Sequence, residues 1–172
     1  MAAFALDICL ASLVESGAKQ FPYGNMESTI VKTLPDLSLD PLYVTGLCEA
    51  EASFTYGRTP SGIRPRFKIR FHESDKELIF AIHRFFGVGA IYGPTWTFAV
   101  TKKAELARII EHFEANPLKG AKAAGYQIWK RICELTFTGS RANWAEVEEL
   151  ATLLSSMSTK ARHPSASGLM HP

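Results

Sequence analysis

Hydrophobic and polar positions form a regular pattern that begins near residue 40. Asp40 followed by Pro41 is typical of a helix start, because Asp accepts hydrogen bonds from the first N–H groups and Pro at the first helical position sacrifices none. We therefore expect a helix from residue 41 to about residue 51. Residues 53–58 and 63–72 have the composition of two strands, joined by the turn at residues 59–62. This pattern predicts a hairpin directly after a helix.

A second helix and a second hairpin are predicted next. Ser74 with Glu77 has the spacing of a capping box, and an apolar stripe continues to Gly87, where the helix is expected to end. Residues 90–92 and 96–100 are two short runs of strand-forming residues around a Gly-Pro turn. The order of elements thus repeats.

Three more helices are expected after the second hairpin. Apolar residues at helical spacing between 106 and 113 predict one that stops at Asn116-Pro117, and residues 122–135 and 143–154 predict two more. The chain beyond Ser155 has the composition of a disordered tail.

The pattern divides the chain into an N-terminal extension (1–39), a core (40–138), a C-terminal helix (139–155) and a tail (156–172). At 172 residues with 47% hydrophobic content, the chain is long enough for one domain with a substantial core. Residues 2–14 lack the basic start of a signal peptide and the length of a membrane span. A short amphipathic helix or a read-through extension is the interpretation we favour there, and no membrane association is expected.

Charge and cysteine content exclude some classes of site. The net charge is only +2, so an argument for a polyanionic partner must depend on where the charges lie. Cys9, Cys48 and Cys133 are widely spaced and odd in number, which argues against a disulfide framework and against a zinc site. A reducing intracellular setting fits best.

The predicted second strand has one cationic face and one apolar face. Its outward positions are Arg64, Arg66, Lys68, Arg70 and His72, and the alternate positions are Ile63, Pro65, Phe67, Ile69 and Phe71. Outward side chains advance about 6.6 Å per pair of residues, close to the rise of two base pairs, and a two-stranded ribbon fits the major groove of DNA. A half-solvated strand is the alternative, but no acidic residue interrupts the run before Glu73, which favours a polyanion site.

The preceding strand adds short polar groups that can contact base edges. Ser53 and Thr55 share one face of this strand, and Tyr56 and Arg58 share the other. Pro65 in the second strand predicts an edge position in the sheet, because Pro cannot donate to a strand ladder.

The first helix carries a close-packing face and two acidic residues. Gly46 and Ala50 are four apart, so they lie on one face and allow another helix to approach closely. Glu49 and Glu51 lie at the C-terminal end, where acidic groups oppose the helix dipole and are costly for stability. Two readings stay open: an intramolecular contact with solvated glutamates, or a two-fold helix pair that brings two Glu51 carboxylates together as ligands for Mg²⁺.

Residues 44–52, Val-Thr-Gly-Leu-Cys-Glu-Ala-Glu-Ala, resemble the LAGLIDADG motif of homing endonucleases. Later segments resemble that family in order and spacing, and the resemblance covers about residues 42–135. These segments are Phe67-Lys68-Ile69 with Asp75, residues 85–92, and Pro117-Leu118 with Lys122, Ile128 and Trp129. The resemblance implies an α+β fold of αββαββα order, with a four-stranded antiparallel saddle-shaped sheet and added C-terminal helices.

The resemblance also implies roles for particular residues. The last acid of the motif binds a divalent metal, which places Mg²⁺ or Mn²⁺ at Glu51 with the backbone carbonyl of Ala50. A basic residue follows the second hairpin and its helix, and Lys122 is our choice for this catalytic role over its rival Lys119. The motif helices pair through Gly46, Leu47 and Ala50. The implied DNA-binding residues are Ser53, Thr55, Arg58, Arg64, Arg66, Lys68, Arg70 and His72.

The function expected from these roles is a metal-dependent, staggered double-strand break in a long DNA site. One motif per chain implies a homodimer and a roughly palindromic target. An intron-encoded protein of this kind would be intracellular, in a mitochondrion or plastid. Ala52 stands where the family has Gly, so the helix-to-strand turn is expected to differ.

Two binding proteins are the alternatives to a nuclease. A maturase-like relative would use the same fold to brace intron RNA during splicing, but such a protein has no need for a metal carboxylate at Glu51. A DNA-binding regulator would usually carry an added helix-turn-helix, and the region after residue 143 is too short for one.

Overall fold

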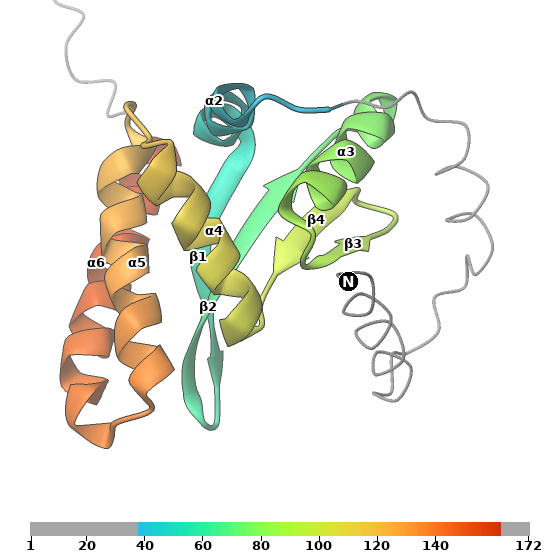
Figure 1. Cartoon of the computed structure of the whole chain (residues 1–172). Coiled ribbons are helices and arrows are strands. Elements are labelled where there is room, and N and C mark those ends of the chain that lie inside the picture. Colours follow the sequence, from blue (N-terminus) through green and yellow to red (C-terminus); the bar gives the residue numbers. More distant parts are fainter. Residues whose placement is uncertain (1–37, 163–172) are drawn as a thin grey trace, which may run out of the picture. The chain divides into compact units, whose positions relative to one another are not determined.

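The computed structural model describes residues 38–162 (Figure 1), and the predictions made for residues 1–37 and 163–172 lie outside this range. The order of its elements confirms the predicted αββαββα pattern followed by C-terminal helices. The elements are α2 (Pro41–Glu51), β1 (Ala52–Thr59), β2 (Gly62–Arg70), α3 (Lys76–Phe86), β3 (Ala90–Tyr92), β4 (Thr97–Val100), α4 (Lys103–Ala115), α5 (Lys122–Thr138) and α6 (Trp144–Arg162).

Four strands of the described chain form one antiparallel sheet in the order β1-β2-β4-β3. β2 is therefore an interior strand, and the edge position predicted from Pro65 is wrong for the strand as a whole. It holds locally, because β4 pairs only with Phe67 to Arg70, which leaves the Pro65 segment with β1 as its partner. A proline is tolerated where one side of the strand lacks a neighbour.

In the first half of the described chain, two helix ends follow the sequence and one helix start departs from it. The Asp40 carboxylate accepts hydrogen bonds from the N–H groups of Leu42 (2.8 Å) and Tyr43 (3.2 Å), and Gly87 ends α3 in the left-handed conformation with φ 64°. The capping box predicted at Ser74 is wrong. A 3₁₀ turn, Glu73–Asp75, precedes α3, and the His72 ring caps that turn by accepting from the Ser74 N–H.

The last helix is longer than predicted. α6 continues to Arg162, whereas the sequence pattern predicted an end near residue 155. Val147, Ala151 and Leu154 of α6 are buried in the core, and the helix continues beyond them. Composition alone does not show where such a helix ends.

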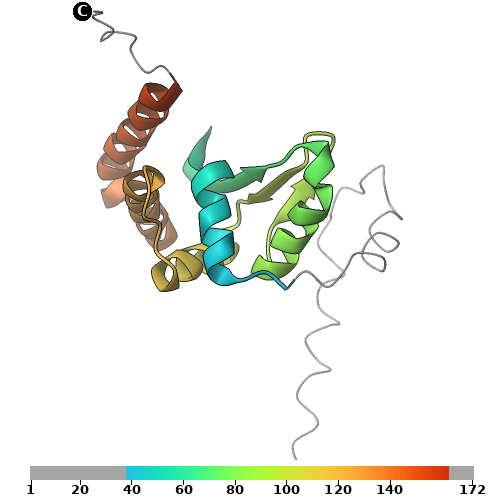
Figure 2. The same ribbon diagram turned by 90° about the horizontal axis from the view of Figure 1, so that it is seen from above.

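The core lies between the sheet and the helices that cover one of its faces (Figures 1 and 2). Phe67 of β2 is fully buried and makes edge-type contacts with Phe86 of α3, Phe98 of β4 and Phe113 of α4. Phe54 of β1 joins the same cluster through Phe113, at a ring distance of 5.4 Å. Aromatic pairs in this geometry contribute about 0.5–1.5 kcal/mol each beyond the area they bury. No helix within residues 38–162 is both long and apolar enough to cross a membrane.

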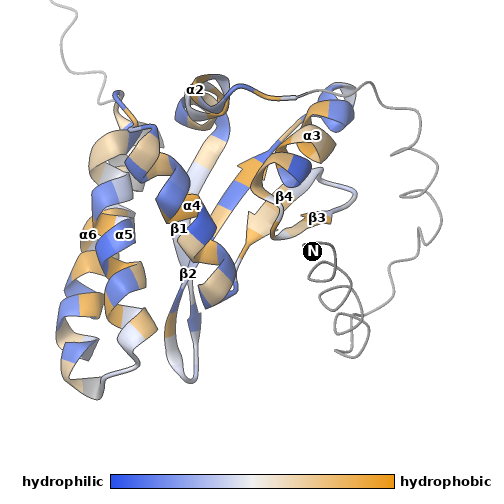
Figure 3. Ribbon diagram, viewed as in Figure 1, coloured by the Kyte–Doolittle hydropathy of each residue, from blue (hydrophilic) through white to orange (hydrophobic). Residues whose placement is uncertain are grey.

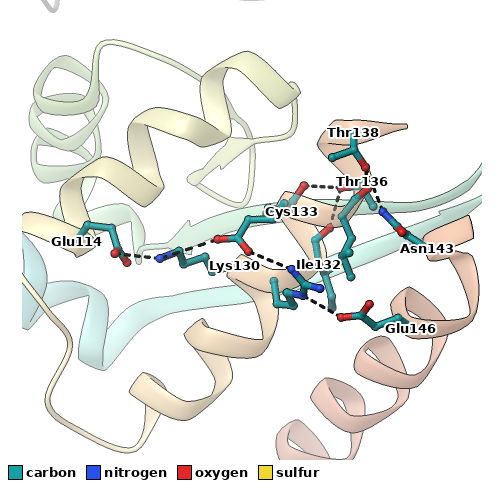
Figure 4. A network of polar contacts seen from close by, with 11 residues as sticks. Glu114, Lys130, Ile132, Cys133, Thr136, Thr138, Asn143 and Glu146 are labelled. Atoms are coloured by element: carbon teal, nitrogen blue, oxygen red, sulfur yellow. Dashed lines mark hydrogen bonds and ion pairs between the residues drawn. The ribbon is translucent and has the colours of Figure 1, made fainter. Parts of the chain in front are cut away.

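A chain of ion pairs joins α4, α5 and α6 (Figure 4). Lys130 of α5 lies 2.9 Å from Glu114 of α4 and 4.0 Å from Glu134, and Arg131 links Glu134 to Glu146 of α6. These side chains are partly exposed, so each pair contributes only about 0–1 kcal/mol. They link side chains of α4, α5 and α6 to one another.

α6 supports the first hairpin from the core side of the sheet. Arg58 of β1 donates two hydrogen bonds to the Glu148 carboxylate at 3.0 and 2.8 Å. Tyr56 and Ser155 are joined by a 2.8 Å hydrogen bond between their hydroxyls, and the Trp144 indole lies where a Cβ at Gly62 would be. Glycine is therefore required at Gly62 both by this contact and by its φ of 110°.

Candidate active site and nucleic-acid interface

The end of α2 passes directly into β1 without an intervening loop. Ala52 has φ −75° and ψ 153°, which any residue adopts, and its side chain is buried. The junction in this chain therefore needs no positive φ, and Ala52 meets no backbone strain there. Ala50 and Glu51 are both exposed at this end of the helix.

Lys122 lies against the same helix end. Its ammonium donates to the backbone carbonyl of Ala50 at 2.8 Å and to that of Cys48 at 3.3 Å. Burial lowers the pKa of Lys122, and the nearby Glu51 carboxylate opposes that shift by favouring the charged form. The structure thus brings together the three groups that the sequence assigned to catalysis and metal binding. Lys119, the rival for the basic role, is exposed.

The oxygen donors at this end fit a hard divalent cation. The carbonyl of Ala50 already accepts a cationic group, and the carboxylate of Glu51 is exposed beside it at the negative end of the helix dipole. Cys48 does not compete as a ligand, because burial raises the pKa of its thiol to about 12. Within the described part of the chain, no group of three or more His, Cys, Asp and Glu side chains gathers in a metal-binding arrangement. The Glu51 carboxylate and the Ala50 carbonyl are the oxygens at this helix end that could hold such an ion.

One face of α2 has no cover from the rest of the described chain. Leu42 is 67% exposed and Tyr43 is 51% exposed, although both are large and apolar. Gly46 and Ala50 continue this face, and a Cβ placed at Gly46 would meet no atom within 4 Å. Leu47 is only partly exposed, because it also packs against the core. Exposed apolar residues grouped on one helix face indicate an interaction surface.

The buried face of α2 is held by a polar contact. The Thr45 hydroxyl lies 3.1 Å from Nε2 of His112 in α4 and within 3.2 Å of the Asn116 carbonyl. A Nε2–H of neutral His112 would donate to this hydroxyl, which leaves the hydroxyl proton for a carbonyl. Burial lowers the pKa of His112, so the ring is neutral at neutral pH.

We expect acid to weaken the fold through His112. As pH falls below about 6.5, the unfolded chain binds a proton that the folded ring resists, so the free energy of unfolding falls with pH. The His112→Gln variant, which stays neutral, should show a flatter dependence than the parent in urea unfolding between pH 7.5 and 5.5. An unchanged slope in His112→Gln would contradict this assignment.

The sheet face opposite the helices carries the basic row. Arg64, Arg66 and Lys68 of β2 are paired across the strands with Gly57, Thr55 and Ser53 of β1, and paired residues point to the same side of an antiparallel sheet. Arg70 extends the row and is paired with Thr97 of β4. The alternate residues of β2 are buried, so the strand alternates in hydropathy along its length (Figure 3). The sequence predicted this alternation correctly.

Two residues predicted for this face do not join it. Arg58 is paired with Ile63, which places it on the core side of the sheet, where it is held by Glu148. Arg58 was predicted for this face because of its charge. Alternate residues of a strand point to opposite faces, however, and Arg58 does not alternate with Ser53 and Thr55 in a way that places it on their face. His72 lies beyond the end of β2 at Arg70, and its ring caps the next turn.

A family model described as LAGLIDADG endonuclease matches residues 44–133, which is more than half of the chain. The chain belongs to the LAGLIDADG endonuclease family. Its αββαββα order and four-stranded sheet are those expected from that membership.

Individual relatives of this LAGLIDADG chain are intron proteins and endonucleases. An uncharacterized 50.9 kDa protein in ND4 intron 1 of Podospora anserina is 32% identical over 115 residues, which is 60% of this chain and 26% of that protein. The meganuclease I-CpaMI, solved bound to uncleaved DNA, is 33% identical with a TM-score of 0.55 over 61% of this chain and 42% of that one. The homing endonuclease I-TnaI shares the fold, with a TM-score of 0.64 at 23% identity over 73% of this chain and 98% of that one. The chain thus spans about a quarter of the Podospora protein and about two fifths of I-CpaMI.

The sequence missed several residues of the LAGLIDADG site. Leu42 and Tyr43 extend the uncovered face of α2, and Leu42 has the same four-residue spacing from Gly46 as Ala50. Tyr92 and Thr97 are paired in the second hairpin on the same side as Arg70. The alternation of polar and apolar residues in that hairpin could have predicted the face on which Thr97 lies. Its strands are short, however, and the order of strands in the sheet cannot be inferred from local sequence.

Proposed function

We propose that this LAGLIDADG chain is a site-specific homing endonuclease that binds double-stranded DNA. The observation that carries the proposal is the direct passage from Glu51 into β1, which joins a cation-binding helix end to a basic sheet face. Two relatives with solved structures support it. I-CpaMI is bound to uncleaved DNA, and I-GzeII is in complex with its DNA target. I-GzeII is 25% identical, with a TM-score of 0.60 over 78% of this chain and 54% of that one.

In this proposal, the open sheet face reads the DNA. Arg64, Arg66 and Arg70 supply charge-assisted hydrogen bonds to phosphates, because each guanidinium presents donors in a planar fork. Ser53 and Thr55 are short side chains on the same face and suit direct contact with base edges. The helices on the opposite face keep the sheet rigid, so side-chain positions are set before binding.

Glu51 and the Ala50 carbonyl would hold a Mg²⁺ or Mn²⁺ ion at the end of α2. A bound ion of this kind lowers the pKa of water and stabilises a leaving oxygen during phosphodiester hydrolysis. I-SmaMI, which shares the fold at 21% identity, was solved bound to its uncleaved DNA target in the presence of calcium ions. The Lys122 ammonium, which donates to the same Ala50 carbonyl, would stabilise negative charge on the reacting phosphate.

The uncovered face of α2 is the proposed dimer interface. A homodimer would place the α2 face of one protomer, with Leu42, Gly46 and Ala50, against that of its partner. The two Glu51 carboxylates would then serve the two DNA strands and produce a staggered double-strand break. A two-fold protein implies a roughly palindromic target.

The alternative of a maturase-like RNA-binding protein has less support. The matching family is one of endonucleases. The relatives I-CpaMI and I-GzeII were both solved in complex with DNA. The Podospora relative lies in an intron of ND4, a mitochondrial gene, which supports an intron-encoded, organellar origin for this chain.

Selection from a DNA library tests the proposed activity. The full chain is incubated with randomised DNA duplexes and Mg²⁺, and the new ends are sequenced. We expect staggered ends within one roughly palindromic site. Ends at many unrelated sequences, or none above the background of the Glu51→Gln variant, would reject a site-specific nuclease.

We expect the basic row to control the salt dependence of DNA binding. Arg66→Ala and Arg70→Ala should each weaken binding by about tenfold at moderate salt and lower the slope of log affinity against log salt by about one, because each removes one phosphate contact. Fluorescence anisotropy in calcium over a salt series measures both quantities. Arg84→Ala removes the same charge from the exposed surface of α3 and should leave the slope unchanged. An unchanged slope in both row variants would exclude the phosphate role.

A further inference from the structure

The other acid of the motif, Glu49, has partners of its own. Its Oε1 accepts hydrogen bonds from two consecutive backbone N–H groups, those of Lys119 at 2.7 Å and Gly120 at 2.6 Å. Charge-assisted hydrogen bonds of this length are among the stronger ones in proteins. The Glu49 side chain is thereby committed to the loop between α4 and α5, and it does not extend beside Glu51 as a second free carboxylate.

Gly120 is what lets the carboxylate approach so closely. A Cβ at this position would lie 2.8 Å from Oε2 and 3.1 Å from Cδ of Glu49, which is closer than such atoms pack. The Gly120 carbonyl accepts from the N–H of Ala123 at 3.1 Å and so begins the first turn of α5. The N-cap residue Ala121 makes no side-chain hydrogen bond, so the anion of Glu49 is the charge that complements this helix start.

The same segment carries Lys122 back to the motif helix. Lys122 follows Gly120 by two residues, and its ammonium donates to the carbonyls of Cys48 and Ala50, the residues on either side of Glu49. The two segments therefore contact each other in both directions. The Glu49 carboxylate of the helix end accepts from the loop N–H groups, and the Lys122 ammonium donates to carbonyls of the helix end. The position of the ammonium therefore depends on where the loop is held.

We propose that Glu49 is a positioning residue: it latches the 119–120 loop to the end of α2 and thereby sets Lys122 beside Glu51. This inference deepens the proposed nuclease function and rests on it for the role of Lys122. The latch requires an oxygen acceptor at Glu49 and does not require a metal-binding carboxylate. A glutamine can keep the two hydrogen bonds, whereas an alanine cannot.

The test compares Glu49→Gln, Glu49→Ala and Gly120→Ala in the full chain. Single-turnover cleavage with Mg²⁺ and DNA binding in calcium are measured for each variant. We expect Glu49→Ala and Gly120→Ala to cut at least about tenfold more slowly with DNA affinity within about threefold, because a small displacement of a catalytic group has large effects on rate. Glu49→Gln should recover at least about a third of the parental rate. Glu149→Ala, an exposed acid on α6, controls for loss of one charge.

Amide hydrogen exchange gives a readout that needs no activity. Exchange at Lys119 and Gly120 should be at least about tenfold faster in Glu49→Ala than in the parent, with Glu49→Gln much closer to the parent. Glu49→Gln as inactive as Glu51→Gln would overturn the latch in favour of a charge or metal role. Parental cleavage and exchange in Glu49→Ala would show a merely solvated acid. A parent that cuts no DNA would remove the nuclease proposal, while the exchange experiment would still decide whether the latch exists.

Discussion

Glu51→Gln should abolish DNA cleavage while leaving DNA binding in calcium within about threefold of the parent. Glutamine keeps the size of the side chain and one oxygen, but it loses the negative charge that would hold the proposed divalent ion beside the Ala50 carbonyl. Because metal-ion stabilisation contributes several kcal/mol to the transition state, we expect a loss of at least about a thousandfold in the single-turnover rate. The change does not touch the basic row on the sheet, so affinity is maintained.

The neighbouring acid provides the control for Glu51. Glu49→Gln makes the same chemical change two residues earlier, at a carboxylate that is bound to backbone N–H groups of Lys119 and Gly120. We expect it to keep measurable cleavage where Glu51→Gln does not. Parental activity in Glu51→Gln would refute its role, and a joint loss of DNA binding and of thermal stability would show misfolding instead.

Gly46→Leu should convert the proposed dimer into a monomer. In this protomer a Cβ at Gly46 meets no atom within 4 Å, so a leucine is accommodated by the isolated fold. On a close-packed helix pair the same side chain holds the two backbones apart, and we expect dimer affinity to fall by at least about a hundredfold. Sedimentation velocity at several concentrations measures the change, and circular dichroism confirms that the fold is retained.

A leucine elsewhere separates the interface from a general effect of added hydrophobic surface. Ala107 is an exposed residue of α4, and Ala107→Leu should sediment as the parent does. Gly46→Leu with the parental mass would refute the α2 interface. Loss of cleavage together with the dimer would link the second protomer to the reaction.

The sequence predicted most elements of the fold because their signals are local. Asp40, Pro41 and Gly87 each act on the nearest turn of helix, and the alternation from Ile63 to Phe71 needs no knowledge of the partner strand. The Pro65 edge position failed because strand order is a property of the whole sheet. The end of α6 was missed because its final turns are polar and lack a stop signal.

The candidate site divides in the same way. Glu51, Ala50 and Lys122 came from a family resemblance, and their proximity depends on contacts between segments 72 residues apart. Arg58 was chosen for its charge, but the strand register places it against Glu148. The partners of Glu49 are backbone N–H groups of a distant loop, and backbone donors are present at nearly every residue, so no sequence pattern identifies them.

The direct passage of α2 into β1 fixes where the proposed enzyme would cut. Ser53 follows Glu51 by two residues, a span of at most about 6.6 Å that contains no loop to bend or lengthen. In the proposed enzyme, the distance between the scissile bond and the first base pair contacted is therefore fixed by the fold. A variant redesigned to bind a different base sequence should therefore keep the same stagger between its two nicks.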